Sequence, residues 1–291
     1  MIFSKNIDLP HFAAFPLLDR PKYKIILRNY FIEYLEIAKL HGTGYILESP
    51  TWRANTDWGF KLGYNEKELI MVNQKAIEFI KQLRKSYEDK IDEILISGQI
   101  GPRGDGYQIE NLMTASEAQK YHSLQIEAFH RSGVDMVSAI TMTYTEEAIG
   151  ICFAAQKNNL PVVISFTVET DGKLPNGDSL EEAIDKVDKA TNNYPLYYMI
   201  NCAHPTHFID VLKGDFDWKS RIKGIRANAS CKSHAELDES TELDAGNIAE
   251  LAEWHNKLNE YLPGLMVFGG CCGTDASHVE SICKHVLNSA Y

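Results

Sequence analysis

Short runs of β-branched and other apolar residues recur along the chain, and each is followed by a longer amphipathic or polar stretch. The run Val162-Val163-Ile164 is apolar at successive positions, which is typical of a strand that is covered on both faces. The pattern predicts strands at 44–48, 93–97, 134–140, 161–168, 197–202, 222–226 and 265–269. Helical periodicity predicts helices at 66–87, 116–131, 145–157, 179–192, 245–261 and 277–289. The alternation of strands and helices predicts parallel βαβ units in an α/β fold.

The N-terminal region departs from this alternation. Residues 6–19 have no regular pattern and a helix is expected from about 23 to 41, with no strand before it. We therefore expect a TIM-barrel-like (β/α)8 fold with seven parallel strands, in which the first strand is missing. No linker rich in Pro, Gly or Ser divides the chain, so residues 1–291 are predicted to form a single domain.

Composition narrows the class of protein. Of the 291 residues, 44% are hydrophobic and 24% are charged, as in ordinary folded soluble proteins. The 40 acidic residues exceed the 29 basic ones and give a net charge of -11, which argues against nucleic acid or an anionic membrane as a partner. The longest stretch without charged residues, 190–209, contains Asn and Pro and is unsuited to span a membrane, and no signal-peptide core follows Met1. We expect a cytoplasmic protein, and a homo-oligomer is compatible with the sequence.

Three cysteines are predicted to meet at one edge of the sheet. Cys202 ends the predicted strand 197–202, and Cys271 and Cys272 follow the strand 265–269 in a glycine-rich turn. Three thiolates at the carboxyl ends of parallel strands would form a tetrahedral Zn²⁺ site whose fourth position is open to water or substrate. From the residues alone, a redox dithiol and simple burial remain alternatives.

Several motifs resemble the homocysteine S-methyltransferase family, which includes the betaine and S-methylmethionine enzymes. These motifs are Gly-Gly-Cys-Cys-Gly at 269–273, Asn-Cys at 201–202, Ser-Gly-Gln-Ile-Gly-Pro at 97–102, Ile-Ser-Phe-Thr at 164–167 and Gly-Asp-Ser-Leu-Glu-Glu-Ala at 177–183. They occur in the family's order from about residue 25 to the C-terminus. The resemblance implies a (β/α)8 barrel in which Cys202, Cys271 and Cys272 hold zinc.

The resemblance also implies an enzyme that transfers a methyl group from a small sulfonium or ammonium donor to a small thiol acceptor. The implied acceptor is homocysteine, and the product is methionine. A thiol that binds to the metal loses its proton near neutral pH and can then attack the activated methyl group. The methyl donor is not specified by the sequence, because donor contacts lie in variable loops at the strand ends.

The chain departs from the family at two substrate-binding positions. Family members begin with a strand that ends in Asp-Gly-Gly, and this chain starts after the place of that motif. A start codon further upstream is one explanation for the missing strand. Many members carry a Glu that holds the amino group of homocysteine, where this chain has the apolar Ile140. Another acid, such as Glu48 or Glu169, would then bind the amino group, unless the acceptor is a different thiol. Glu48, Thr141 and Asn201 are the predicted substrate contacts, and no catalytic residue is assigned.

Two other functions remain open at this level. The absent first strand and Ile140 are compatible with a non-catalytic or degenerate zinc-binding barrel that binds small thiols. A dithiol redox protein would use Cys271 and Cys272, although a disulfide between adjacent cysteines is strained.

The remaining candidates have simpler predicted roles. Cys152 and Cys283 are predicted to be buried hydrophobic residues, and burial is favoured less strongly for Cys231. His204 and His207 are expected on the surface or behind the metal ligands. The segment 48–55 is expected to line the substrate pocket or to be a solvated loop, and the acidic run 236–242 is expected to be a solvated loop.

Overall fold

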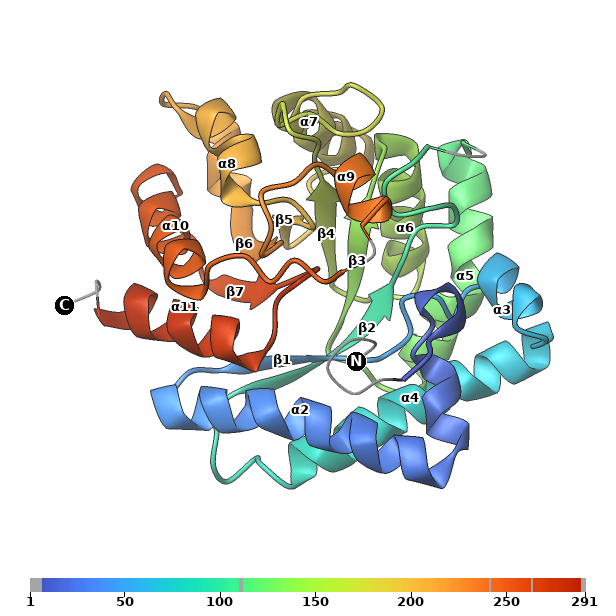
Figure 1. Cartoon of the computed structure of the whole chain (residues 1–291). Helices are drawn as coiled ribbons and strands as arrows, with labels where there is room; N and C mark the ends of the chain where they lie inside the picture. The colour runs from blue at the N-terminus through green and yellow to red at the C-terminus, as the bar shows by residue number, and fades with distance from the viewer. Residues whose placement is uncertain (1–6, 110–111, 241, 263, 289–291) are drawn as a thin grey trace. The chain divides into compact units, whose positions relative to one another are not determined.

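The computed structural model of the chain describes residues 7–109, 112–240, 242–262 and 264–288 (Figure 1). Seven parallel strands form one sheet in the order in which they follow one another along the chain. They are β1 (Tyr45–Glu48), β2 (Ile94–Ile100), β3 (Met136–Met142), β4 (Val162–Thr167), β5 (Tyr197–Asn201), β6 (Ile222–Ala227) and β7 (Val267–Gly270). The predicted strands are therefore confirmed, with ends that differ by a few residues. In the described part of the chain before β1, residues 7–44, there is no strand, as expected.

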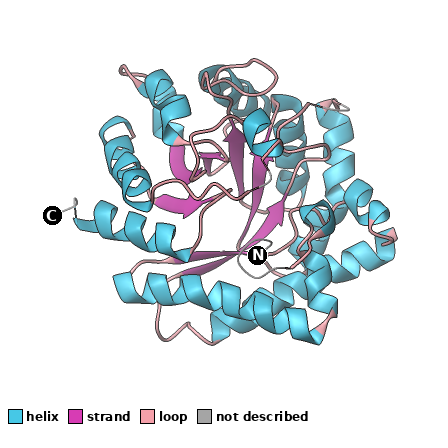
Figure 2. Cartoon of the chain, viewed as in Figure 1, coloured by secondary structure: helices cyan, strands magenta, loops and turns pink. Residues whose placement is uncertain are grey.

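Helices alternate with the strands, as the cyan and magenta segments of Figure 2 show. The long ones match the predicted periodic segments, and three of them begin with a capping box at Asn65, Thr114 or Ser179. They are α2 (Pro21–His41), α4 (Glu66–Lys85), α5 (Ala115–Arg131), α6 (Thr145–Lys157), α7 (Leu180–Thr191), α10 (Ile248–Tyr261) and α11 (Ala276–Asn288).

Short helices lie in segments for which the sequence pattern predicted no helix. They are α3 (Thr56–Lys61), α8 (Pro205–Phe208), α9 (His234–Asp238), η1 (Pro10–Phe12), η2 (Phe15–Asp19), η3 (Ile209–Leu212) and η4 (Asp217–Arg221). The acidic run 236–242 was wrongly expected to be loop throughout, because it begins inside α9. Ser233 and Glu236 form a capping box there, and a local cap of this kind stabilises a single turn that has no hydrophobic period.

The chain divides into two compact units. The first contains residues 1–103, 112–140 and 146–163, and the second contains residues 104–111, 141–145 and 164–291. The prediction that residues 1–291 form a single domain stays a prediction.

The first unit is built on α4 and the strands β1 and β2. Leu69, Ile77 and Leu83 of α4 are fully buried, as is Ile96 of β2. Buried positions recur along α4 at intervals of three and four residues, which places them on one helix face: Leu69, Val72, Ala76, Ile80 and Leu83. Burying a large apolar side chain contributes about 1.5–3 kcal/mol.

The second unit buries aromatic residues between β4 and β5, where the rings of Phe166 and Tyr198 stack with centroids 6.0 Å apart. The hydroxyl of Tyr198 donates to Asp188 at 2.7 Å, and Arg221 pairs with the same carboxylate at 2.8 Å. This shared pairing satisfies a carboxylate that is almost completely buried.

His255 of α10 makes the stability of the second unit sensitive to acid. It is fully buried, its Nδ1 donates to the carbonyl of Leu251 at 2.8 Å, and its Nε2 has no partner among the described residues. Burial lowers the pKa of His255 from 6.5 to about 4, with a smaller contribution from His204. The unfolded chain therefore binds a proton below pH 6.5 that the folded chain takes up only near pH 4. The stability that neutral His255 contributes is complete above pH 6.5 and decreases as the pH falls from 6.5 toward about 4.

We expect the free energy of unfolding to fall by about 2 kcal/mol between pH 7 and pH 5 on account of this one group. Urea unfolding of the wild type and of His255→Leu at both pH values measures it, and the variant is expected to lose that part of the pH dependence. The control is His130→Leu, which replaces an exposed imidazole in α5. An unchanged pH dependence in His255→Leu would contradict the prediction.

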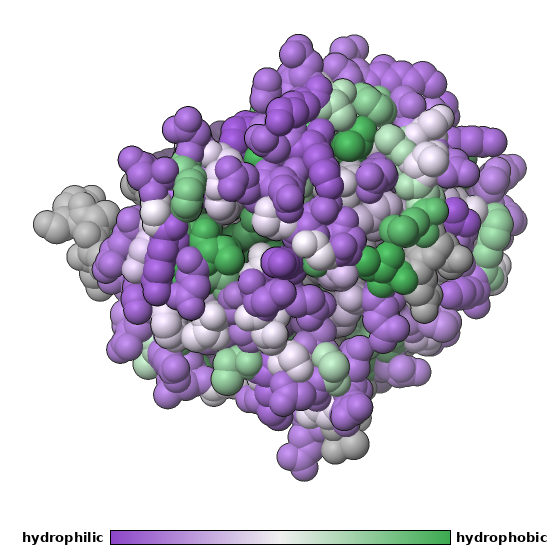
Figure 3. All heavy atoms as spheres, turned by 90° about the horizontal axis from the view of Figure 1, so that it is seen from above, coloured by the Kyte–Doolittle hydropathy of each residue, from purple (hydrophilic) through white to green (hydrophobic). Residues whose placement is uncertain are grey.

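No helix in the described part of the chain is long and apolar enough to cross a membrane. On the face seen in Figure 3, hydrophilic residues predominate and hydrophobic residues occur in separate small groups.

Candidate functional site

Three cysteine side chains of the second unit meet at the carboxyl ends of β5 and β7. The sulfur atoms of Cys202, Cys271 and Cys272 all lie within 4.8 Å of one another. Cys202 and Cys271 form a disulfide, and Cys272 is a free thiol. The sequence therefore identified the three residues that converge. The disulfide joins a different pair from the adjacent cysteines considered in the redox alternative.

The register of β5, β6 and β7 brings the cysteines together. Cys202 N donates to the carbonyl of Arg226 at 3.0 Å, and Cys271 N donates to the carbonyl of Ala227 at 2.8 Å, so each cysteine continues a strand pairing. Cys202 has a φ of 55°, a left-handed conformation that is uncommon for a residue with a side chain. This conformation ends β5, and it is maintained by the hydrogen bonds that surround Cys202.

A glycine is required at the turn that follows Cys272. Gly273 has a φ of +80°, and a Cβ atom there would lie 2.5 Å from the carbonyl oxygen of Asp244. A larger residue would displace the turn that carries both adjacent cysteines.

Asn228 connects the two cysteine segments and was missed by the sequence analysis. Its Nδ2 donates to the carbonyl of Cys202 at 2.9 Å, and its Oδ1 accepts from Cys272 N at 3.1 Å. The side chain is buried, so these bonds are shielded from water. Its position directly after β6, like that of Cys202 after β5, is the signal that would have identified it.

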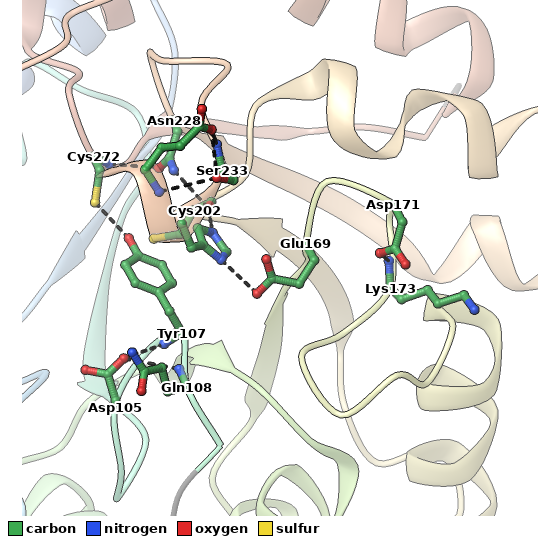
Figure 4. Close-up of polar contacts among 12 residues, drawn as sticks. Asp105, Tyr107, Gln108, Glu169, Asp171, Lys173, Cys202, Asn228, Ser233 and Cys272 are labelled. Carbon is green, nitrogen blue, oxygen red and sulfur yellow. Dashed lines mark hydrogen bonds and ion pairs between the residues drawn. The ribbon is translucent and has the colours of Figure 1, made fainter. Parts of the chain in front are cut away.

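Tyr107 lies over the cysteine cluster and was also missed. Its hydroxyl is 3.1 Å from Cys272 Sγ (Figure 4). Its ring stacks on the imidazole of His234 with centroids 4.0 Å apart. Burial raises the pKa of Tyr107 well above its usual range, and the nearby Cys272 adds to this effect. Crowding around the sulfur raises the pKa of the Cys272 thiol as well, although the residue as a whole is exposed.

His234, at the start of α9, links the cysteine cluster to an acidic residue. Its Nε2 donates to the carbonyl of Cys202 at 2.6 Å, and its Nδ1 lies 3.1 Å from Glu169 Oε1. Because α9 has no hydrophobic period, no pattern in the sequence indicated this contact.

Two of the predicted substrate contacts, Thr141 and Asn201, lie in the same unit as the cysteines and are buried. Asn201 Oδ1 accepts from Thr141 N at 3.0 Å and from Ser165 Oγ at 2.6 Å, and Asn201 Nδ2 donates to Thr141 Oγ1 at 2.8 Å. Thr141 has a φ of 68°, which is a rare conformation for a β-branched residue, and the amide of Asn201 holds it. The substrate role of both residues stays a prediction.

The third predicted substrate contact, Glu48, belongs to the first unit, where its Oε2 accepts from Gln99 Nε2 at 2.9 Å. The segment that follows it is not a solvated loop, because Ser49, Thr51 and Arg53 are buried. Thr51 Oγ1 donates to the carbonyl of Gln99 at 2.7 Å, so side-chain bonds to a neighbouring strand keep this segment inside. Glu48 as a substrate contact stays a prediction.

The other histidines and cysteines mostly lie as expected. His204 is buried and caps α8 by accepting from Thr206 N, so the surface position, one of the two expected for it, is wrong. His207 Nε2 donates to the carbonyl of Cys231, whose own side chain is exposed. Cys152 is buried, as predicted, and Cys283 is partly buried.

Comparison with known proteins identifies the class of protein. A family model described as homocysteine S-methyltransferase matches residues 2–286. Homocysteine S-methyltransferase 1 of Arabidopsis thaliana is 22% identical over 321 residues, which cover 97% of this chain and 89% of the relative. Homocysteine S-methyltransferase 2 of the same plant is 21% identical over 308 residues, which cover 97% of this chain and 88% of the relative.

Solved structures show the same fold. The crystal structure of the homocysteine methyltransferase MmuM from Escherichia coli in its metallated form has a TM-score of 0.74 at 16% identity and covers 97% of this chain and 91% of that chain. The oxidized form of the same protein has a TM-score of 0.73 at 16% identity, with coverages of 99% and 91%. The TIM-barrel-like α/β fold is confirmed. The chain belongs to the homocysteine S-methyltransferase family, as the sequence motifs implied.

Proposed function

We propose that this protein transfers a methyl group from a small sulfonium or ammonium donor to homocysteine and forms methionine, with zinc held by Cys202, Cys271 and Cys272. The observation that carries the proposal is the convergence of three cysteine sulfurs within 4.8 Å in a member of this family. Family membership supports the reaction class, and the sulfur cluster supports the metal.

The donor set fits zinc. In a tetrahedral site with Zn–S bonds of about 2.3 Å, the sulfurs lie roughly 3.8 Å apart, which the observed spacing accommodates once the Cys202–Cys271 disulfide is reduced. Bound zinc would supply a Lewis acid that favours the thiolate form of the acceptor at neutral pH. The need for reduced thiols favours a cytoplasmic location.

The residues around the cluster would orient the reactants and exclude water. Asn228 fixes the backbone on both sides of the cluster, and the ring of Tyr107 covers one side of it. Methyl transfer to sulfur requires an in-line approach of donor and acceptor, so most of the rate enhancement would come from such positioning. The negative charges of Asp105 and Asp238 lie close enough to Tyr107 to raise its pKa. Negative charge at this place favours the approach of a positively charged methyl donor.

The test is an assay of the reduced, zinc-loaded protein with homocysteine and either S-methylmethionine or betaine. We expect methionine to form with at least one donor, and we expect treatment with a chelator to reduce the rate to background, because the thiol acceptor then lacks its activating metal. Mass spectrometry of the product provides the measurement. A fully zinc-loaded protein that forms no methionine from either donor would contradict the substrate assignment.

The second candidate function is a zinc-bearing protein that binds small thiols without turnover. The observation that favours it is the buried, apolar Ile140, which stands where many family members carry a substrate-binding Glu. Thiol binding without methyl transfer in the same assay would support this alternative.

A further inference from the structure

Glu169 lies just past the carboxyl end of β4, in the same unit as the cysteine cluster. Its backbone is fixed in a tight turn, because Glu169 N donates to the carbonyl of Lys173 at 2.8 Å and Gly172 N donates to the carbonyl of Glu169 at 3.0 Å. The carboxylate of Glu169 lies within 3.1 Å of His234 Nδ1, and its side chain remains 36% exposed. Glu169 is therefore held in place and still open to a ligand.

Only one of the two carboxylate oxygens is occupied. Oε1 lies 3.1 Å from His234 Nδ1, whereas no donor among the described residues reaches Oε2. A carboxylate accepts about four hydrogen bonds through its two oxygens. Glu169 thus retains the capacity to bind a cationic group that donates several hydrogen bonds, such as a primary ammonium.

The imidazole of His234 connects this carboxylate to the metal-binding residues. Its Nε2 donates to the carbonyl of Cys202 at 2.6 Å, and its ring face is covered by Tyr107. One imidazole ring thus separates Glu169 from the backbone of Cys202. In homocysteine, a chain of three carbon atoms separates the thiol from the ammonium group.

Two other carboxylates near the cluster, those of Asp105 and Asp244, already have partners within the protein. Asp105 Oδ1 accepts from the backbone N–H groups of Tyr107 and Gln108, at 2.8 and 3.2 Å. Asp244 accepts from Ser230 Oγ at 2.7 Å and pairs with Lys232 at 3.5 Å. These bonds fix loops around the cluster and leave Glu169 as the better candidate for a ligand.

We propose that Glu169, oriented by His234, binds the ammonium group of the thiol acceptor and makes the site selective for α-amino thiols. This inference rests on the proposed function, and it assigns to Glu169 the recognition for which the buried Ile140 is unsuited. A charge-assisted hydrogen bond between a carboxylate and an ammonium group is stronger than a neutral one, so it discriminates against thiols that lack the amino group.

The test compares the binding of two thiols by calorimetry to the reduced, zinc-loaded protein. One is homocysteine, and the other is γ-mercaptobutyrate, which has the same carbon chain and carboxylate but no amino group. We expect the wild type to prefer homocysteine by roughly 10- to 50-fold. We expect Glu169→Gln to lose this preference by weakening homocysteine alone, and Glu169→Asp to restore part of it. The control is Glu181→Gln, which removes an exposed carboxylate from α7.

Zinc content measured on the same samples separates recognition from a structural role. Unchanged zinc with lost selectivity supports the proposal. Equal weakening of both thiols, a loss of zinc, or unchanged selectivity in Glu169→Gln overturns it, and so does a wild type that shows no preference for homocysteine. A wild type that selects homocysteine but transfers no methyl group contradicts the proposed reaction and leaves this recognition standing.

Discussion

Replacement of Cys272 by alanine is expected to remove zinc from the protein and to abolish methyl transfer. A catalytic zinc site typically has three protein ligands, so a site left with two thiolates holds the metal far less tightly. Since changes behind the ligands already reduce metal affinity by about 10- to 100-fold, we expect the loss of a ligand to exceed about 100-fold. Cys202→Ala and Cys271→Ala are expected to behave in the same way, because all three sulfurs share one cluster.

Elemental mass spectrometry of protein purified under reducing conditions provides the measurement. We expect about one zinc per chain in the wild type and close to none in the three variants. Cys231→Ala is the matched control, because Cys231 is an exposed free thiol in the same unit. Zinc retained by a folded Cys272→Ala variant would exclude the three-cysteine site.

The strands were predictable because their burial produces an apolar pattern that does not depend on the rest of the molecule. Val162-Val163-Ile164, for example, lies in a strand that is buried along its whole length, and the predicted limits of β4 differ from the observed ones by one residue at each end. The carboxyl ends of parallel strands lie at one edge of the sheet, so the convergence of Cys202 with Cys271 and Cys272 followed from their places at the ends of two strands.

The residues around the cluster were not predictable in the same way. Tyr107 lies in a glycine-rich loop, and His234 lies in a five-residue helix, so neither belongs to a segment with hydrophobic periodicity. Their positions depend on contacts between segments far apart in the sequence, such as the stacking of these two rings. The same holds for Glu169, whose carboxylate became a specific candidate only once His234 was found beside it.

Replacement of Asn201 by alanine is expected to destabilise the protein and to weaken zinc binding. The amide of Asn201 joins β5 to β3 and β4 through Thr141 and Ser165, immediately before Cys202. Alanine leaves the buried N–H of Thr141 without its acceptor, at a cost of about 1–3 kcal/mol, and the unpaired hydroxyls add to it. We expect the free energy of unfolding to fall by about 3 kcal/mol and zinc affinity to fall about tenfold.

Urea unfolding and a zinc competition titration distinguish this structural role from the substrate contact predicted for Asn201. A substrate contact would raise the KM for homocysteine and leave stability and zinc affinity at wild-type values, which would contradict the expectation above. Asn259→Ala serves as the control, because Asn259 is half-buried in α10 and its replacement is expected to change stability by less than about 0.5 kcal/mol.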